Sequence, residues 1–384
     1  MPCVAGRIEV RYRMYLNKSI AVVVPCKNEA SQITGVMESM PDMVDAIVVI
    51  DDGSTDGMDT VVKDYAQRDD RVHLIRHEQS QGVGGAIAAG YAWARHEGFD
   101  ISVVMAGDGQ MDPDDLQLVV HPVAAGLADY CKGNRFTYPG GIQRIPPTRK
   151  FGNFVLSILT KIASGYWHVS DTQTGYTSIS LSALERIDVE KIYHTYGCPN
   201  DILIRLNVAE MRVCEVPINP LYNVGEKSKM RVFRVMRPIL WLLFKRFGWR
   251  MVYKHIIISG HPLVASYVFS ALFLLTSVAL CVLVIVKRIA TGEIGPATLI
   301  TSGVFLIVGI QFLLTAFWMD SDANRHLCVR LTPDLIDSLR PKKTRFQRPG
   351  RTTRSAKSVN DSSKAPEPPV VETRRESIPA GRTE

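Results

Sequence analysis

The chain has 384 residues, of which 46% are hydrophobic, and a formal net charge of +7 at pH 7. This length is sufficient for one large domain or two ordinary ones. The seven cysteines include no CxxC pair and no Cys/His cluster, which argues for reduced cytosolic thiols and against a zinc site. The absence of a basic stripe with interleaved aromatic residues argues against a nucleic-acid partner, so an anionic membrane surface suits the charge better.

Residues 18–235 are predicted to form an α/β domain with a mainly parallel sheet, because short β-rich runs alternate with amphipathic helical stretches. Residues 1–17 precede it as an extension without the apolar core of a signal peptide, so we expect the domain to remain in the cytoplasm. Strands are expected at 20–24, 46–50, 72–76, 101–105, 176–179 and 212–217, and helices at 29–40, 56–68, 84–97, 153–165 and 199–210.

Polar clusters follow three of the expected strands. They are PCKNEA (25–30), IDDGSTDGM (50–58) and AGDGQMD (106–112). Any one of them could be an ordinary turn, because Asp, Gly, Ser and Asn are common turn residues. In open α/β sheets, however, ligands bind outside the carboxyl ends of the strands, so three such clusters on one edge indicate a binding site.

Two of these clusters carry carboxylates that suit a nucleotide. Asp51 and Asp52 end a strand and can accept hydrogen bonds from a nucleobase or from ribose hydroxyls. Asp108 lies where a divalent cation could join it to a diphosphate, with Gln110 as a further oxygen ligand. Mg²⁺ and Mn²⁺ favour oxygen ligands, and Mg²⁺ often binds through one or two protein carboxylates, with phosphates and water completing its shell.

The glycine-rich segment GVGGAIAAG (82–90) is close to a dinucleotide-binding pattern. It follows the third expected strand rather than the first, and no acid stands at the expected distance on a following strand end. We therefore interpret this segment as a helix of small residues that packs closely against the sheet.

Several charged residues beyond the third cluster are candidates for ligand binding. Arg135, Arg149 and Lys229 could bind anions, although a solvated surface position explains each one equally well. Asp171 and Asp201, taken singly, are more typical of helix caps or hydrogen-bonding residues than of catalysts.

Two uncharged stretches, 262–286 and 294–319, are each long enough to cross a hydrocarbon core of about 30 Å. Core helices rarely run so long without a charge, so we expect a transmembrane hairpin over 261–320. Lysine and arginine are frequent on both outer flanks and few in the connection, which places both termini and the domain in the cytoplasm. An amphipathic interfacial segment is expected at 236–260, and a basic, largely disordered tail at 321–384.

Seven short motifs occur in an order that resembles one enzyme family. They are VVVPCKNEA (22–30), VVIDDGSTDG (48–57), GDGQ (107–110), KGNRF (132–136), DTQTGY (171–176), NDILIRLN (200–207) and GEKSKM (225–230). They resemble the family 2 glycosyltransferases with a GT-A fold, and within them the polyprenyl-phosphate branch that includes dolichyl-phosphate mannose synthases. The resemblance implies a Rossmann-like, mainly parallel sheet. It also implies inverting transfer of a hexose from a nucleotide-diphosphate sugar to a polyprenyl phosphate at the cytoplasmic membrane face.

The resemblance also implies a role for each matching residue. The residues that would contact the base and ribose are Pro25, Asn28, Glu29, Asp51 and Asp52. Asp108 and Gln110 match the second acid and the amide of the family's metal motif, which implies a Mg²⁺ or Mn²⁺ cofactor. The residues that would contact phosphate groups of the donor or acceptor are Arg135, Arg149 and Lys229. Asp171 and the segment Thr174, Gly175 and Tyr176 would line the sugar pocket, and Asp201 takes the position of a catalytic base.

Two positions depart from the family pattern. Ala106 stands where the family usually carries its first metal acid, and Thr177 stands where dolichyl-phosphate mannose synthases often carry arginine. One retained metal ligand still fits a phosphate acceptor, because a phosphate monoester has a second pKa of about 6 and is anionic at neutral pH. Its reaction requires in-line positioning and charge neutralisation more than a strong base.

Two other functions are compatible with the sequence. A transferase that adds sugar to a polysaccharide or glycolipid hydroxyl would share the nucleotide-binding motifs. No QxxRW-like motif follows them, however, and two spans are few for an export channel. A catalytically weakened membrane scaffold that binds a nucleotide sugar would be consistent with Ala106. Self-association into a homo-oligomer is compatible with each of these functions.

Overall fold

Runs of valine, isoleucine and alanine form the central strands of a sheet. β1 (Ile20–Cys26) has the sequence IAVVVPC, and β2 (Ala46–Asp51) has the sequence AIVVID. Every residue of both strands is buried, which is typical of parallel strands that are covered on both faces.

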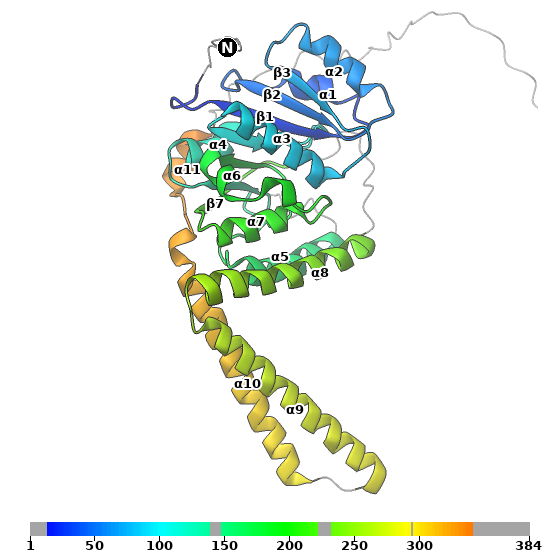
Figure 1. The fold of residues 1–384 in the computed structure, drawn as a ribbon, viewed down its shortest axis with the longest axis vertical. Coiled ribbons are helices and arrows are strands. Elements are labelled where there is room, and N and C mark those ends of the chain that lie inside the picture. Colours follow the sequence, from blue (N-terminus) through cyan, green and yellow to red (C-terminus); the bar gives the residue numbers. More distant parts are fainter. Residues whose placement is uncertain (1–13, 139–146, 222–231, 293–294, 341–384) are drawn as a thin grey trace, which may run out of the picture. The chain divides into compact units, whose positions relative to one another are not determined.

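The structure, a computed structural model, describes residues 14–138, 147–221, 232–292 and 295–340, with only the backbone at 147–151 and 232–235. The chain divides into a unit over Met1–Pro341 and a second unit over Lys342–Glu384, which lies outside the described residues. All the helices and strands named below belong to the first unit (Figure 1).

The sheet has the strand order β3-β2-β1-β4-β6-β5-β7 within the described residues. The other strands are β3 (Val72–Arg76), β4 (Ile101–Val104), β5 (Tyr130–Asn134), β6 (Thr177–Ser180) and β7 (Val213–Pro217). β1 is parallel to β2 and β4, β2 to β3, and β5 to β7, whereas β6 is antiparallel to both β4 and β5. This mainly parallel, Rossmann-like sheet of the GT-A type confirms the predicted fold class.

Helices connect the strands and cover the sheet. They are α1 (Ile33–Glu38), α2 (Met58–Ala66), α3 (Val83–Glu97), α4 (Leu116–Ala124), α5 (Pro147–Ser164), α6 (Leu181–Arg186), α7 (Cys198–Val208) and α8 (Val232–Arg250). After them come the π-helix η4 (Met251–Ile258), α9 (Leu263–Thr291), α10 (Pro296–Ala323) and α11 (Pro333–Leu339). Short 3₁₀ turns lie at Pro113–Asp115, Val189–Lys191 and Arg325–Leu327.

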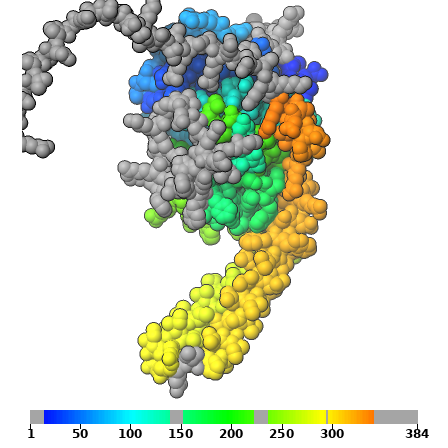
Figure 2. All heavy atoms as spheres, turned by 180° about the vertical axis from the view of Figure 1, so that it is seen from behind, coloured from blue at the N-terminus to red at the C-terminus, as the bar shows by residue number. Residues whose placement is uncertain are grey.

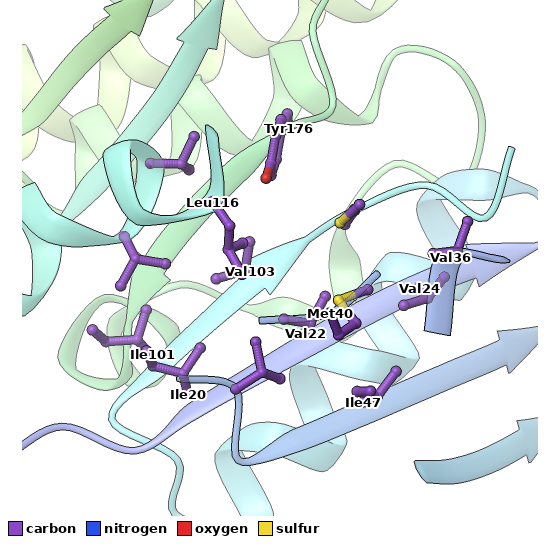
Figure 3. Close-up of a cluster of buried hydrophobic side chains, with 14 of the residues drawn as sticks. Ile20, Val22, Val24, Val36, Met40, Ile47, Ile101, Val103, Leu116 and Tyr176 are labelled. Carbon is purple, nitrogen blue, oxygen red and sulfur yellow. The ribbon is translucent and has the colours of Figure 1, made fainter. Parts of the chain in front are cut away.

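Hydrophobic side chains pack on both faces of the sheet, because successive residues of a strand point to opposite sides. Figure 3 shows one face, where residues of three strands meet α4 and the segment before β6: Ile20, Val22, Val24, Ile47, Ile101, Val103, Leu116 and Tyr176. On the opposite face, Val23 packs among the side chains that α3 covers. A Cβ at Gly90 would overlap the Val23 side chain, which confirms that the glycine-rich segment 82–90 serves close packing.

α9 and α10 lie side by side, and both are long and apolar enough to cross a membrane (Figure 1). Small residues line their contact, where the Ser270 hydroxyl donates to the Gly309 carbonyl at 2.9 Å. Large apolar side chains cover the outer faces, and Leu275 and Ile307 are each 70% exposed. A core helix of a soluble protein would bury such side chains, so the two helices support the predicted membrane hairpin.

The segment that follows α10 differs from the expected disordered tail. The Val329 N–H donates to the Val213 carbonyl of β7 at 3.0 Å, and Leu335 and Ile336 of α11 pack against the core of the sheet domain. Figure 2 shows this segment, in orange, against that domain. The expected start of the tail at residue 321 is therefore too early, because the apolar face of α11 docks on the sheet domain. Residues 341–384 lie outside the described part of the chain.

Candidate active site

Hydrogen bonds join the loops that follow β1 and β2 at the carboxyl edge of the sheet. The Asn28 N–H donates to Ser54 Oγ at 2.9 Å, and the Thr55 N–H donates to Asn28 Oδ1 at 2.8 Å. The Ala30 N–H donates to Asp56 Oδ2 at 2.9 Å. Asn28 has a left-handed φ of +57°, which asparagine adopts more readily than most residues. Two of the three polar clusters thus form one connected rim.

The loop after β4 joins this rim through a close contact at Gly107. A Cβ at Gly107 would overlap Cys26 Sγ and lie 2.7 Å from Glu29 Oε2, so a larger residue has no room there. Burial, followed by the carboxylates of Glu29, Asp51 and Asp108, raises the pKa of the Cys26 thiol. Acids from all three loops therefore surround one buried side chain, as the positions of the clusters after their strands predicted.

Asp51 and Pro25 lie at the ends of the paired strands β2 and β1. Asp51 Oδ1 accepts from the Ser54 N–H at 2.8 Å, and Asp51 Oδ2 lies 3.4 Å from Arg76 Nε. The Pro25 carbonyl accepts from the Gly107 N–H at 3.4 Å. Both residues help to shape the rim, and the Asp51 side chain is fully buried beneath it.

Asp52 is held by the loop between β3 and α3. Its carboxylate accepts from the side chains of His77 and Ser80 at 2.9 and 2.6 Å, and from the Gln81 and Gly82 N–H groups at 2.7 and 2.9 Å. Burial raises the pKa of Asp52, but these hydrogen bonds outweigh burial and hold the pKa below its usual value. Asp52 thus orders this loop, a role that the sequence did not predict.

Asp108 lies in the turn after β4 with its side chain half-buried. Asp108 Oδ1 accepts from the Gln110 N–H at 3.0 Å, and burial raises the pKa of the Asp108 carboxyl. A divalent cation would favour the charged carboxylate, so the residue suits a metal ligand. No group of three His, Cys, Asp or Glu side chains that could hold a metal occurs within the described residues. A cation at Asp108 would therefore need oxygen atoms of a bound phosphate and water.

The loop after β7 contacts the loop that carries Asp108 and Gln110. The Leu221 N–H donates to the Gln110 backbone carbonyl at 3.1 Å, and Met111 forms an isolated bridge with Pro220. These contacts hold the backbone of the loop that carries Asp108 and Gln110 against the loop after β7. Ala106 adds no ligand atom from its side chain, and its N–H lies 3.3 Å from Met111 Sδ.

Arg135 and Asp171, predicted separately as phosphate and sugar contacts, bind each other. Arg135 Nε donates to Asp171 Oδ2 at 2.7 Å and Arg135 Nη2 to Oδ1 at 2.9 Å. Burial raises the pKa of Asp171, but the charge of Arg135, its hydrogen bonds and the charge of Lys132 together outweigh burial and hold the pKa below its usual value. Asp171 is fully buried, whereas a quarter of the Arg135 side chain is exposed. Asp171 thus holds the arginine in place, and part of Arg135 faces outward.

Glu215 of β7 supports this pair and was missed in the sequence. Its Oε1 accepts from the Ser170 and Asp171 N–H groups at 2.9 Å each, and its Oε2 accepts from Asn134 Nδ2 at 2.9 Å. Burial raises the pKa of Glu215. Glu215 could have been recognised in the sequence as an acid within the otherwise apolar strand VCEVP. A carboxylate in a covered strand needs hydrogen-bond donors nearby.

Lys132 of β5 was also missed, and it supports the loop before β6. Its side chain is fully buried, Lys132 Nζ donates to the Thr174 carbonyl, and burial lowers the pKa of Lys132 to about 8. Gly175 leaves space beside Met111, whose Cε would lie 3.5 Å from a Cβ at that position.

Tyr176 differs from its predicted place in the sugar pocket. Its side chain is fully buried in the core (Figure 3), with its hydroxyl donating to the Asp112 carbonyl at 3.1 Å.

Asp201, predicted as the catalytic base, is fully buried between two arginines. Arg205 Nε of the same helix lies 2.9 Å from Asp201 Oδ2, and Arg246 Nε of α8 lies 2.6 Å from Asp201 Oδ1. The Tyr193 N–H also donates to Asp201 Oδ2, at 3.0 Å. Both carboxylate oxygens of Asp201 are thus engaged by donors of the protein itself. The structure therefore corrects the prediction, because Asp201 connects α7 to α8.

Two predicted phosphate contacts cannot be placed by their side chains. Arg149 falls in the first turn of α5, where only the backbone is described, and Lys229 lies outside the described residues. Both therefore stay predictions from the sequence.

Comparisons with known proteins identify related chains. The family model described as Glycosyl transferase family 2 matches residues 21–188. A UDP-N-acetylglucosamine–dolichyl-phosphate N-acetylglucosaminyltransferase of Methanococcus voltae is 32% identical over 57% of this chain and 92% of its own length. An undecaprenyl-phosphate mannosyltransferase of Micrococcus luteus is 28% identical over 55% and 87%. A polyprenol monophosphomannose synthase of Mycolicibacterium smegmatis is 32% identical over 51% and 75%.

Solved structures of one enzyme are also similar. Glucosyl-3-phosphoglycerate synthase of Mycobacterium tuberculosis, in a complex with Mn²⁺, UDP and glucosyl-3-phosphoglycerate, aligns with a TM-score of 0.48 and 21% identity. The alignment covers 60% of this chain and 80% of that enzyme.

Proposed function

The chain belongs to glycosyl transferase family 2, and from this premise we propose that it transfers a hexose from a nucleotide-diphosphate sugar to a polyprenyl phosphate. One observation carries the proposal: a rim of acids at the carboxyl edge of the sheet and a hairpin of two membrane-length helices occur in the same unit. The names of the relatives support the lipid acceptor, because each contains a dolichyl, undecaprenyl or polyprenol group.

The proposed reaction joins an acceptor phosphate oxygen to the anomeric carbon of the sugar. As this bond forms, the bond from that carbon to the donor's diphosphate oxygen breaks, and its electron pair leaves with the nucleotide diphosphate. Attack opposite the leaving group inverts the anomeric centre. A phosphate monoester has a second pKa of about 6, so the acceptor is anionic at neutral pH and no side chain has to take a proton from it. The arginine-bound state of Asp201 is compatible with such a reaction.

The rim supplies the groups that such a donor needs. Asp51, with Arg76 beside it, would bind the nucleoside end, and Asp52 would keep the loop before α3 in position. Asp108, with the Gln110 amide, would hold a Mg²⁺ or Mn²⁺ ion. When bound, this ion would offset the negative charge that develops on the departing diphosphate. The exposed part of Arg135 would meet a phosphate, with Asp171 fixing its orientation.

Exposed apolar side chains on α5 and α8 support a position at the membrane surface. Phe154 of α5 and Trp241 and Phe244 of α8 are 63%, 67% and 69% exposed. Trp241 and Phe244, together with Arg237, Pro238 and Leu240, line a hollow of about 720 Å³. Aromatic and basic residues together suit the headgroup region of a bilayer. The flanking charges of the hairpin favour the cytoplasmic face, where we place the domain.

The test is a transfer assay with the purified full chain. UDP-N-acetylglucosamine, UDP-glucose and GDP-mannose are each offered with undecaprenyl phosphate in lipid vesicles, with Mg²⁺ or Mn²⁺ and then with EDTA. We expect one donor to yield a polyprenyl-phosphate sugar, and EDTA to abolish the product. Transfer only to a glycolipid or polysaccharide hydroxyl would establish the alternative acceptor. A chain that binds none of these donors with either metal would contradict the proposed donor class.

A further inference from the structure

The foot of the membrane hairpin contains a buried ion pair. Asp320, near the end of α10, and Arg250, the last residue of α8, are both fully buried. Arg250 Nη1 donates to Asp320 Oδ1 at 2.9 Å and Nη2 donates to Oδ2 at 3.0 Å. Arg250 Nη2 also donates to the Ile162 carbonyl of α5 at 3.0 Å. Two parallel bonds between a guanidinium and a carboxylate fix direction as well as distance.

A residue of the sheet domain and the residue that follows α10 hold this pair in place. Trp167 Nε1, in the segment after α5, donates to Asp320 Oδ2 at 3.3 Å, and Asn324 Nδ2 donates to Asp320 Oδ1 at 3.0 Å. A Cβ at Gly165 would overlap Arg250 Nη1 and lie 2.8 Å from Asn324 Nδ2. The turn after α5 therefore closes directly over the pair, and a side chain at Gly165 would separate its partners.

Lys254 of η4 forms a second connection between the same parts. Lys254 Nζ donates to Asn207 Oδ1 of α7 at 3.0 Å and to Asn324 Oδ1 at 2.9 Å, and it lies 2.7 Å from Glu210 Oε1. Asn207 Nδ2 donates to Asn324 Oδ1 at 2.8 Å. Helices α5, α7 and α10 thus meet α8 and its extension η4 at one buried polar cluster, which we call the junction.

Stability alone does not explain why the junction is charged. The desolvation cost of burying two charges offsets much of the attraction between them. Apolar side chains of similar volume therefore often stabilise a protein equally well. Apolar contacts, however, are not directional, and they would allow α10 to turn or slide against the sheet domain. The bidentate bond between Arg250 and Asp320 is directional, so it favours one height and one rotation of α10.

We propose that Arg250 and Asp320 are positioning residues for the reaction with a membrane-held acceptor. By fixing the hairpin to the sheet domain, they set the distance and angle at which the candidate site meets a phosphate that is anchored in the bilayer. This inference rests on the proposed function, because it concerns the same transfer reaction. An acceptor that diffuses freely in water does not depend on that distance.

The test compares two acceptors with the full-length chain in phosphatidylcholine vesicles. One is undecaprenyl phosphate in the same vesicles, and the other is a short-chain, water-soluble prenyl phosphate. The donor is whichever of UDP-N-acetylglucosamine, UDP-glucose and GDP-mannose the wild-type chain accepts. We expect Asp320→Asn to lower kcat for the vesicle acceptor by about 100-fold, with kcat for the soluble acceptor and KM for the donor little changed. Asp322→Asn, at an exposed acid two residues along α10, is the matched control and is expected to affect neither.

Two further variants keep the inference testable if Asp320→Asn fails to fold. Arg250→Lys retains the charge but not the bidentate bond, and we expect it to show a smaller selective loss. The double variant Arg250→Met with Asp320→Leu leaves no unpaired buried charge, and we expect it to fold and still favour the soluble acceptor.

Equal losses with both acceptors in a folded variant would overturn the inference, because the pair would then be merely structural. A double variant with wild-type transfer to the vesicle acceptor would overturn it as well. If the wild-type chain transfers sugar to neither acceptor, the proposed function itself fails.

Discussion

Asp52 and Asp108 are carboxylates on the same rim, yet their pKa values are shifted in opposite directions. Hydrogen bonds from the loop after β3 outweigh burial at Asp52 and lower its pKa, whereas burial dominates at Asp108 and raises its pKa. A carboxylate already saturated by the chain serves to order a loop. The desolvated one suits a cation that arrives with a substrate.

The substitution Asp108→Asn tests the metal assignment. Asparagine keeps an oxygen for the Gln110 N–H but removes the charge. We therefore expect transfer to fall by about 100- to 1,000-fold, with the melting temperature unchanged. Rates at saturating Mg²⁺ and Mn²⁺, together with thermal shifts on adding Mn²⁺ and UDP, measure the effect. Asp114→Asn, at an exposed acid in the turn that follows, is the control. Transfer near the wild-type rate in Asp108→Asn would contradict the assignment.

Asp115 provides a pH-dependent prediction. Burial raises the pKa of Asp115 to about 7, and Asp112 and Asp114 also raise this pKa, while the Asn219 N–H and Arg340 lower it. In the unfolded chain an aspartate titrates near 3.9. The folded protein therefore binds this proton more tightly, so the contribution of Asp115 to stability is present below about pH 4 and is lost as the pH rises through 7.

Asp115→Asn should remove this dependence on pH. Its side-chain oxygen can still accept the Asn219 N–H, a bond of 2.6 Å in the wild-type chain. We expect the variant to be more stable at pH 8 by about 4 kcal/mol, and nearly unchanged at pH 4. Melting temperatures across this range measure the effect, with Glu185→Gln, at an exposed acid of α6, as the control. A wild-type difference between pH 4 and pH 8 that persists in Asp115→Asn would refute the attribution.

At the scale of elements, β5 is the strand within the described residues that the sequence did not reveal. β5 has the sequence YCKGN, in which the buried Lys132 and a glycine interrupt the apolar pattern. Lys132 is tolerated there because the Thr174 carbonyl accepts its hydrogen bond. Such a partner comes from a distant loop, so a local pattern cannot reveal it. The strand was therefore missed, whereas β1, β2 and β3 were predicted within one or two residues.

Helix α11 provides a prediction at the same scale. Leu339 is buried against the core of the sheet domain, while Asp337 of the same helix is exposed. We expect Leu339→Ala to destabilise the chain by about 2 kcal/mol and to increase protease cleavage in the segment 328–340. Asp337→Ala is the control and should leave both measurements near wild type. Unchanged cleavage in Leu339→Ala would show that α11 does not depend on this contact.

At the scale of the molecule, the membrane hairpin is attached to the sheet domain at both ends. Before it, Arg250 and Lys254 reach the junction, and after it the Val329 N–H donates to the Val213 carbonyl of β7. A pair of spans attached in this way would place both of its ends on the side of the membrane where the candidate site lies. The flanking lysine and arginine residues favour the cytoplasm for that side.

Reporter fusions in a bacterial host test this orientation. Alkaline phosphatase is active only outside the cytoplasm, so we expect activity when it is fused after Thr291, at the end of α9. Fusion after Arg340, beyond α11, should be inactive, and a fluorescent protein that folds only in the cytoplasm should give the converse result. Phosphatase activity after Arg340 would reverse the proposed orientation.

The sequence by itself determined the fold class, the pair of long apolar helices and the edge of the sheet where the acids gather. Each depends on local information. Alternation of β-rich and helical segments indicates a parallel sheet, length without charge indicates a span, and polar residues directly after strands lie at one edge of a parallel sheet. The clusters at 25–30, 50–58 and 106–112 meet there for that reason.

Only the tertiary structure decided which acids are engaged by other parts of the chain. Asp171 binds Arg135, Asp201 binds Arg205 and Arg246, and Tyr176 lies in the core instead of lining a pocket. Asp320 and Arg250 are 70 positions apart, and no local pattern links them. The physical reason is common to all these cases: the charge state and role of a buried polar group depend on the partners that folding brings to it.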